Sequence, residues 1–373
     1  MTAKPDQSKS TPQRTVLSID AMGGDRGPAP IVSGMASSAK KNANLHFIVH
    51  GPKDELEGLI SNRKILHGRC ELRHCDDAVS MTDKPSQIMR NGKTTSMWSA
   101  LECVRIGEAE VCVSCGNTGA LMALSMIRLR KLAGVNRPAI AVLWPSRSET
   151  GFNVMLDVGA DVRADSKDLF QYALMGVSYA RNGLQISLPK VGLLNVGTEE
   201  HKGRAELREA HELIAKYEQS GEYRFVGFVE GSDIPSDKAD VIVTDGFTGN
   251  VALKTGEGTA QLIGDLLRQA FQYSPLSRLA QLLAVSSLQR LRKRIDPRRV
   301  NGGVFLGLNG TVVKSHGTAD ETGVSAAIKL AVALASSQFS KKLAARVASV
   351  KNLTHHEENA TLEAEKNDDK SSS

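Results

Sequence analysis

Two matching segments constrain the fold more than any other feature of this sequence. Residues 110–124 read EVCVSCGNTGALMAL and residues 240–254 read DVIVTDGFTGNVALK, and they align without a gap at a separation of 240 − 110 = 130 positions. Each opens with an acidic residue, continues through a short apolar run, turns at Gly-x-Thr-Gly and enters a helical pattern. The repeat predicts two related strand-turn-helix units that line one cleft.

Other apolar runs alternate with amphipathic segments in the same manner. Most of these runs are apolar on both faces, as strands buried between helical layers are. We expect strands at 15–20, 45–50, 139–144, 152–157, 190–196, 224–229, 240–245, 303–308 and 311–316, and helices at 165–182, 203–219, 250–272 and 318–338. The predicted fold class is α/β, with three layers (α/β/α) around a mostly parallel, mixed sheet.

The composition is that of a globular protein. The 373 residues are 41% hydrophobic and 24% charged, which is enough for a large core. No apolar run reaches the roughly 18–20 residues that cross a bilayer. The polar beginning has no secretory pattern, and the five cysteines are an odd number, so we expect a cytoplasmic protein with reduced thiols. Residues 1–13 and 346–373 are expected to be disordered, and residues 14–345 to form the α/β domain.

The net charge of +6 is concentrated in one segment. Residues 274–300 contain seven lysines and arginines against Asp296, so 7 − 1 = +6 and the rest of the chain is neutral. Leucines recur there at helical spacing, and Ser286 with Ser287 could mark a break between two short helices. One interpretation is a core helix with a solvated basic face. The other is a protruding amphipathic hairpin, over residues 270–299, that contacts anionic lipid or an acidic protein.

The glycine turns suit an anion. A Gly-x-Thr-Gly turn exposes backbone N–H groups and a hydroxyl, and the next helix adds the positive end of its dipole. The alternative is that the glycines only permit tight turns, while Thr118 and Thr248 only cap helices. A matched pair of turns favours a ligand site. Further small-residue turns imply a polar cleft, and they lie beside Asp20, Asp157, Lys202, Asn250 and His316.

Several other classes of site are poorly supported. The segment GGDRGP does not fit the dinucleotide-binding pattern, and Gly-Lys-Thr at residues 92–94 lacks the first glycine of a Walker loop. Cys112 and Cys115 would point to opposite faces of a strand, and no second cysteine pair has zinc-binding spacing. We therefore expect no metal and no cofactor. The competing classes are a nucleotide-dependent dehydrogenase and a nucleic-acid or membrane scaffold; an aromatic content of 4% argues against nucleic acid as a partner.

A series of motifs resembles the phosphate acyltransferase family over residues 15–345. The motifs occur in the family's order: DAMGGDRGP, VSCGNTGALM, RPAIAV, LDVGADV, GLLNVGTEEHKG, VEGSDI, VTDGFTGNVALK and VKSHG. The resemblance implies a fold like that of phosphotransacetylases and isocitrate dehydrogenases, a homodimer, and transfer of a fatty acyl group from acyl carrier protein to inorganic phosphate. It also implies peripheral association with the inner face of the cell membrane, where the acyl phosphate supplies a membrane glycerol-3-phosphate acyltransferase in phospholipid synthesis.

The expected chemistry needs few acid–base groups. A thioester is reactive and phosphate is a nucleophile, so the enzyme has mainly to align the two and stabilise the oxyanion. We predict two catalytic residues. Lys202 would supply the positive charge that offsets the phosphate and the developing oxyanion, and Asn250 would be a neutral hydrogen-bond donor to the same oxygen. The predicted substrate contacts are Gly23, Gly24, Asn117, Thr118, Gly119, Asp245, Thr248, Gly249 and His316.

Alternatives remain for single residues. Lys202 could be a surface lysine, Asn250 a helix cap, and His316 either the acid for the leaving thiolate or a structural histidine. Asp157 and Asp245 would orient loops, because a carboxylate repels phosphate. Cys115 replaces the alanine usual in the family, which favours direct attack by phosphate without a covalent enzyme intermediate.

The basic segment coincides with a projecting hairpin in the family. Its side chains would contact acyl carrier protein or an anionic membrane, and the sequence does not decide between the two. The residues that we predict to make these contacts are Leu279, Leu283, Arg290, Arg292, Lys293 and Arg294.

Overall fold

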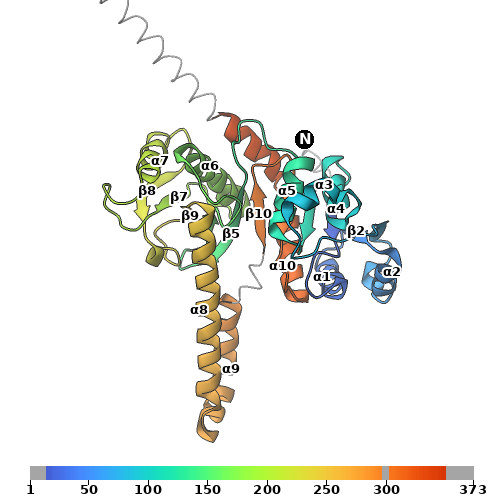
Figure 1. The fold of residues 1–373 in the computed structure, drawn as a ribbon. Coiled ribbons are helices and arrows are strands. Elements are labelled where there is room, and N and C mark those ends of the chain that lie inside the picture. Colours follow the sequence, from blue (N-terminus) through green and yellow to red (C-terminus); the bar gives the residue numbers. More distant parts are fainter. Residues whose placement is uncertain (1–13, 296–301, 350–373) are drawn as a thin grey trace, which may run out of the picture.

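The structure is a computed structural model that describes residues 14–295 and 302–349. A single sheet of eleven strands in these ranges forms its centre, in the order β3-β2-β1-β4-β11-β10-β5-β6-β9-β7-β8 (Figure 1). The strands are β1 Thr15–Asp20, β2 Leu45–Gly51, β3 Cys70–His74, β4 Val111–Ser114, β5 Ala139–Pro145, β6 Phe152–Leu156, β7 Lys190–Leu194, β8 Arg224–Val229, β9 Val241–Val243, β10 Gly303–Leu306 and β11 Thr311–Lys314.

Helices cover both faces of this sheet, which gives the three predicted layers. The helices are α1 Pro28–Lys41, α2 Lys53–Ser61, α3 Pro85–Asn91, α4 Ser96–Arg105, α5 Thr118–Arg128, α6 Ser166–Gly183, α7 Ala205–Lys216, α8 Gly246–Gln272, α9 Pro275–Ile295 and α10 Glu321–Ser336. Strand alternation divides the core between the faces. Val111 and Val113 face the cluster that contains α1, α6, α7 and α10, whereas Cys112 faces the cluster that contains α4 and α5.

The sheet consists of two parallel halves that run in opposite directions. β4 is parallel to β11, and β10 is antiparallel to both β11 and β5. β5 is antiparallel to β6, and β6 is parallel to β9. β4 and β9 therefore run in opposite directions within the sheet. The sequence repeat predicts the two units correctly but does not show that they face in opposite directions.

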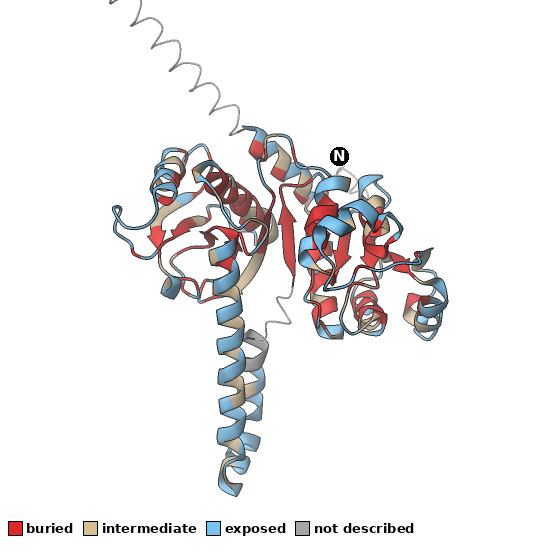
Figure 2. Cartoon of the chain, in the orientation of Figure 1, coloured by how far each residue is buried: buried red, intermediate tan, exposed pale blue. Residues whose placement is uncertain are grey.

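Helices α8 and α9 form a hairpin that projects from the body (Figure 1). Only Gly246 and Gly249 are buried in the 27 residues of α8, and no residue of α9 whose side chain is described is buried (Figure 2). The core-helix interpretation of the basic segment is therefore wrong. A break at Ser286–Ser287 is also wrong, because α9 is continuous over these residues and the chain turns before Pro275.

The predicted disordered ends fall mostly outside the described residues. Residues 1–13 and 350–373 are not described, but residues 339–349 are helical. Phe339, Leu343 and Val347 of this segment are buried at helical spacing. The ordered domain therefore extends beyond the expected boundary at residue 345.

Candidate functional site

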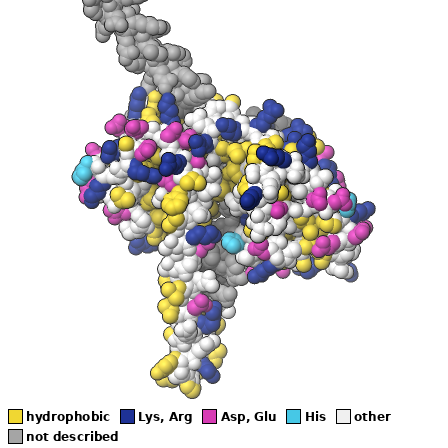
Figure 3. Space-filling view, in the orientation of Figure 1, with side chains coloured by type: hydrophobic (Ala, Val, Ile, Leu, Met, Phe, Trp, Pro, Cys, Tyr) yellow, Lys and Arg dark blue, Asp and Glu magenta, His cyan; other side chains and the backbone are white. Residues whose placement is uncertain are grey.

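A cavity lies where α8 leaves the body. It has a volume of about 560 Å³, within the roughly 300–1,000 Å³ usual for small-molecule sites. β5 and α8 supply most of its walls, and the segment that ends β11 lines another side. Figure 3 shows the surface hollowed here, with a histidine and basic side chains beside the hollow. Predicted residues that line the cavity are Thr118, Asn250 and His316.

Lys314 is a buried cation in the cavity wall. It is the last residue of β11, is 9% exposed, and donates from Nζ to the carbonyl oxygens of Cys115 (3.3 Å) and Ser315. No carboxylate forms an ion pair with it in the described part of the chain. Burial lowers the pKa of Lys314 to about 8. An anion bound in the cavity would compensate the Lys314 ammonium for the hydration that it loses on burial.

Two further basic groups lie beside Lys314. Lys254, on α8, lines the cavity and pairs with Glu257 at 2.7 Å. The pKa of His316 is lowered, first by burial and then by the charge of Lys254. The ring Nδ1 of His316 accepts the backbone N–H of Thr318 at 3.2 Å, so the neutral ring carries its proton on Nε2. Lysines from two elements thus give this wall a positive potential, and His316 adds a neutral N–H donor.

The first glycine turn supplies unpaired donors next to this wall. Thr118 and Gly119 open α5 and are exposed, and their N–H groups have no hydrogen-bond partner among the described residues. Asn117 caps the helix by accepting the N–H of Ala120 at 3.1 Å, and its amide donates to the carbonyl of Met81. The turn therefore offers the N–H groups of Thr118, which lines the cavity, and of its neighbour Gly119, which does not, whereas the Asn117 side chain is already used.

The second glycine turn uses its donors internally. Asp245 caps α8 by accepting the N–H of Thr248 at 2.8 Å and its hydroxyl at 3.0 Å, and Asp245 also pairs with Arg204. The N–H of Gly249 bonds to the carbonyl of Asp245. The prediction that Thr248 and Gly249 donate to phosphate is not supported by this geometry, because both N–H groups are already satisfied.

Close packing explains the glycines of the second turn. A Cβ at Gly249 would lie 1.8 Å from the carbonyl oxygen of Asp157, and one at Gly246 would lie 2.2 Å from that of Asp161. These two glycines let the first turn of α8 rest directly on the loop that follows β6. The second turn therefore fixes the position of α8, and with it the cavity wall.

The same loop is held by a buried carboxylate. Asp157 is fully buried and accepts the N–H groups of Ile140 (2.8 Å), Ala160 and Asp161 (2.7 Å). Burial raises the pKa of Asp157 to about 6, although these bonds oppose the shift. Both Asp157 and Asp245 orient loops, as the sequence suggests.

Asn250 is the predicted catalytic residue that reaches the cavity. It lies one turn into α8, its side chain is exposed, and its Oδ1 lies 3.7 Å from the position of a Cβ on Gly159. Its amide has no hydrogen-bond partner among the described residues. It does not cap α8, since Asp245 has that role. Asn250 is therefore available as a donor to a bound ligand.

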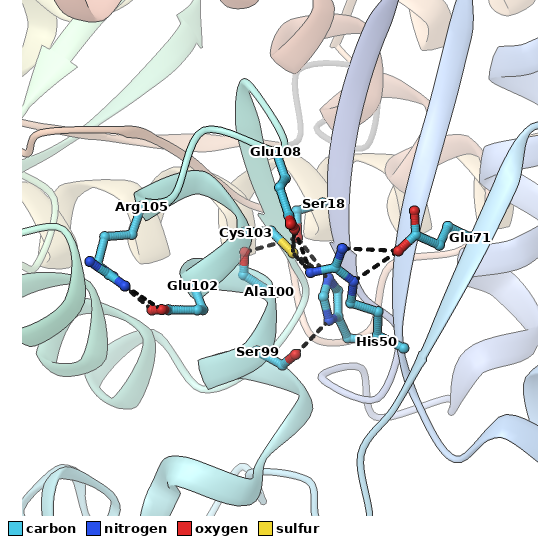
Figure 4. A network of polar contacts seen from close by, with 10 residues as sticks. Ser18, His50, Glu71, Ser99, Ala100, Glu102, Cys103, Arg105 and Glu108 are labelled. Carbon is cyan, nitrogen blue, oxygen red and sulfur yellow. Dashed lines mark hydrogen bonds and ion pairs between the residues drawn. The ribbon is translucent and has the colours of Figure 1, made fainter.

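A second polar network lies away from the cavity, between β1, β2, β3 and α4 (Figure 4). His50 Nε2 lies 2.9 Å from the hydroxyl of Ser18 and 3.7 Å from Cys103 Sγ, and Arg73 pairs with Glu108 at 2.5 Å. Burial lowers the pKa of His50 to about 3 and raises that of Cys103 to about 11. A protonated thiol beside a neutral, fully buried imidazole is not an activated nucleophile.

Comparison with known proteins decides the family. The family described as "Fatty acid synthesis protein" matches residues 15–342. A phosphate acyltransferase from Ruegeria pomeroyi is 68% identical and covers 96% of both chains; one from Ruegeria sp. is 70% identical and covers 94% of this chain and 93% of its own. The chain belongs to the phosphate acyltransferase family. A phosphotransacetylase from Streptococcus pyogenes shares the fold, with a TM-score of 0.56 at 16% identity over 86% of this chain and 94% of its own.

Several predicted residues of this family member lie outside the cavity. Lys202 belongs to the loop after β7, pairs with Glu199 at 2.7 Å, and does not line the cavity. Gly23 and Gly24 do not line it either. A Cβ at Gly23 would lie 2.6 Å from the backbone nitrogen of Gly116, so this glycine permits two loops to touch.

The hairpin residues lie on the projection, apart from the cavity lining. Leu279, Leu283 and Arg290 are exposed on α9. Arg292, Lys293 and Arg294 lie within α9, but their side chains fall outside the described residues. No helix in the described ranges is long and apolar enough to cross a membrane.

The sequence analysis missed the lysines of the site. Lys314 and Lys254 lie within motifs that carry the resemblance, VKSHG and VTDGFTGNVALK, yet neither was predicted. A signal was present for Lys314, because a lysine that ends an apolar strand beside a glycine turn is an unusual buried charge. In the described residues no group of three histidine, cysteine, aspartate or glutamate side chains could hold a metal.

Proposed function

We propose that this protein transfers a fatty acyl group from an acyl carrier protein thioester to inorganic phosphate. Membership of the phosphate acyltransferase family gives the acyltransferase class. The observation that supports the phosphate half of the reaction is Lys314, a buried ammonium that lines a cavity and bonds only to backbone carbonyl oxygens among the described residues. Phosphate binds there, between Lys314, Lys254 and the free N–H groups of Thr118 and Gly119.

The carbonyl of the thioester is attacked directly. A phosphate oxygen forms the new C–O bond, the oxyanion accepts a hydrogen bond from Asn250, and the C–S bond then breaks to release the carrier thiolate. His316 Nε2–H lies in the same cavity as a hydrogen-bond donor to this thiolate, which takes its proton from solvent. Cys115 is 3% exposed, and burial raises its pKa to about 11, so this thiol supports no covalent acyl intermediate.

Lys202 retains a proposed catalytic role that this conformation does not display. Its loop is tied to α8 because Arg204 of the same loop pairs with Asp245, so a movement of the loop is transmitted to the turn before Asn250. Lys202→Ala should lose turnover if this role is correct. Lys238 pairs with Asp233 outside the cavity lining, so Lys238→Ala is the control and should keep turnover.

The other proposed partners would bind the exposed surface of α9. The exposed leucines and arginines of α9 suit an anionic membrane and an acidic carrier protein, and we propose that they bring the site to both. The product, an acyl phosphate, would pass to a membrane glycerol-3-phosphate acyltransferase. We also propose a homodimer at the inner face of the cell membrane.

Formation of acyl phosphate tests the function. Purified protein is incubated with an acyl carrier thioester, with and without phosphate, and the products are separated by mass. The proposal predicts acyl phosphate and free carrier thiol in equal amounts, only when phosphate is present. Release of free fatty acid at the same rate without phosphate would show a thioesterase and overturn it.

A further inference from the structure

The floor of the cavity is an apolar stripe on β5. Ile140, Val142 and Trp144 alternate along the strand and all line the cavity, and Leu253 of α8 lies against the same stripe. At roughly 3.4 Å per residue, about 14 Å separates the first of these side chains from the last. Such a stripe beside a basic wall suits a ligand with an anionic head and an extended apolar tail.

Trp144 closes one end of this stripe against α8. Its indole abuts Gly256, where a Cβ would lie only 2.5 Å from Cη2. Gly256 is therefore required for the ring to reach the helix backbone, since any side chain there would displace it. Pro145 follows immediately and also lines the cavity. Strand, ring and helix thus form a continuous wall across the floor.

We propose that Trp144 and Gly256 form the end wall that sets the length of the acyl chain accepted by this enzyme. The inference rests on the proposed function, because the occupant is the acyl group of its thioester substrate. Continuity with the basic wall supports this occupant: Lys314, His316 and the floor of β5 belong to one cavity. Removing the indole would extend the apolar floor toward Ala260, farther along α8.

Tryptophan fluorescence offers a direct test of contact. The chain has two tryptophans. Trp98, on α4, lies 4.5 Å from the guanidinium of Arg128 and does not line the cavity, so Trp98→Phe leaves Trp144 as the only reporter. This protein is titrated with alkyl phosphonates of increasing chain length, and their binding is measured independently by calorimetry. The emission of Trp144 shifts to the blue only with chains long enough to reach the ring.

Chain-length selectivity gives the second test. The ratio of kcat/KM for long over short acyl thioesters is measured for wild type, Trp144→Ala, Trp144→Phe and Gly256→Ala. Trp144→Ala raises this ratio at least 10-fold, because a few methylenes gain an apolar site. Gly256→Ala lowers it, because the new methyl group pushes the indole into the cavity. Trp98→Ala, the matched control, leaves the ratio unchanged.

The outcomes separate the inference from the proposed function. If acyl phosphate forms and every variant keeps the wild-type ratio, or if phosphonates bind without any change in Trp144 emission, the end wall is refuted while the function stands. If no chain length yields acyl phosphate, the proposed function itself fails. The apolar floor could instead be covered by a second copy of this chain, and light scattering tests this alternative. A variant that changes the oligomeric state but not the chain-length ratio would show that a second copy covers the floor, which also overturns the inference.

Discussion

Lys314 shows most clearly how a single residue connects stability to binding. Burial lowers its pKa from 10.5 to about 8, so the folded protein at pH 7 carries a cost on the order of 3 kcal/mol. Because the unfolded chain binds the extra proton between these two values, this cost is fully present below pH 8 and is relieved as the pH rises toward 10.5. A buried charge that destabilises the folded protein is better explained by a role in binding a ligand than by a role in stability.

Replacement of Lys314 by methionine should separate binding from folding. The variant keeps an unbranched side chain, shorter by the terminal nitrogen, and loses the buried charge, so its melting temperature should equal or exceed that of wild type at pH 7. Its kcat/KM for phosphate should fall at least 100-fold, because the main cation of the cavity is gone. Thermal unfolding and initial rates measure the two effects. An unchanged kcat/KM would exclude Lys314 from the phosphate site.

The pH dependence follows from the same group. The free enzyme attracts phosphate most strongly while Lys314 is protonated, so kcat/KM for phosphate should decline as the pH rises through about 8. In Lys314→Arg the guanidinium stays charged, and the decline should move to higher pH. An alkaline limb at the same pH in both proteins would assign it to another group.

Asn250 provides a test of oxyanion stabilisation. Loss of one oxyanion donor typically costs about 10²–10³ in kcat, and we expect Asn250→Ala to lose that much without loss of stability, because its amide has no partner among the described residues. Exposed Asn309, whose amide bonds to the carbonyl of Lys131, offers a matched control that should keep full turnover. Equal turnover in both variants would remove Asn250 from the mechanism.

At the residue scale, the predicted residues that reach the cavity are ones that follow a strand end or a glycine turn. Thr118, Asn250 and His316 follow strands or glycine turns, and all three line one cavity. Thr248 and Gly249 have the same sequence pattern as Thr118 and Gly119, but their donors are used by Asp245. A pattern of residue types does not say which N–H groups the fold satisfies.

At the scale of elements, the start of α8 depends on two glycines that touch a neighbouring loop. Gly249→Ala should destabilise the protein severely and lower activity, because the methyl group would meet the Asp157 carbonyl at 1.8 Å. Gly258, on the same helix, has nothing within 4 Å of its Cβ position, so Gly258→Ala should stabilise by about 0.5–1 kcal/mol. Urea denaturation of both variants measures the difference. Equal effects would mean that α8 does not pack on this loop.

The two repeated units illustrate what local sequence cannot contain. Each strand, turn and helix was predicted at nearly the right residues. The direction of one unit relative to the other is set by β10 and β5. Each runs antiparallel to the strand that follows it in the chain, and the two pair antiparallel with each other although they lie far apart in the sequence. Because strand pairing over such distances leaves no periodic signal in a segment, opposite orientation could be learned only from the folded structure.

At the scale of the whole molecule, the hairpin is an amphipathic projection that leaves several leucines exposed. Leu279 and Leu283 are 53% and 81% exposed, so anionic vesicles should bind the protein through them. Leu283→Glu should abolish co-sedimentation with such vesicles, while Gln281→Glu on the same helix should weaken it only modestly. Turnover of a water-soluble thioester should be unchanged in both. Equal sedimentation of both variants would place the membrane contact elsewhere.

The central claim is that phosphate binds in the cavity beside Lys314, and a crystal structure grown with orthophosphate tests it most directly. The account predicts a phosphate within hydrogen-bonding distance of Lys314 Nζ and of the N–H groups of Thr118 and Gly119. A phosphate bound instead at the Lys202 loop, with the Lys314 wall empty in an active enzyme, would contradict it.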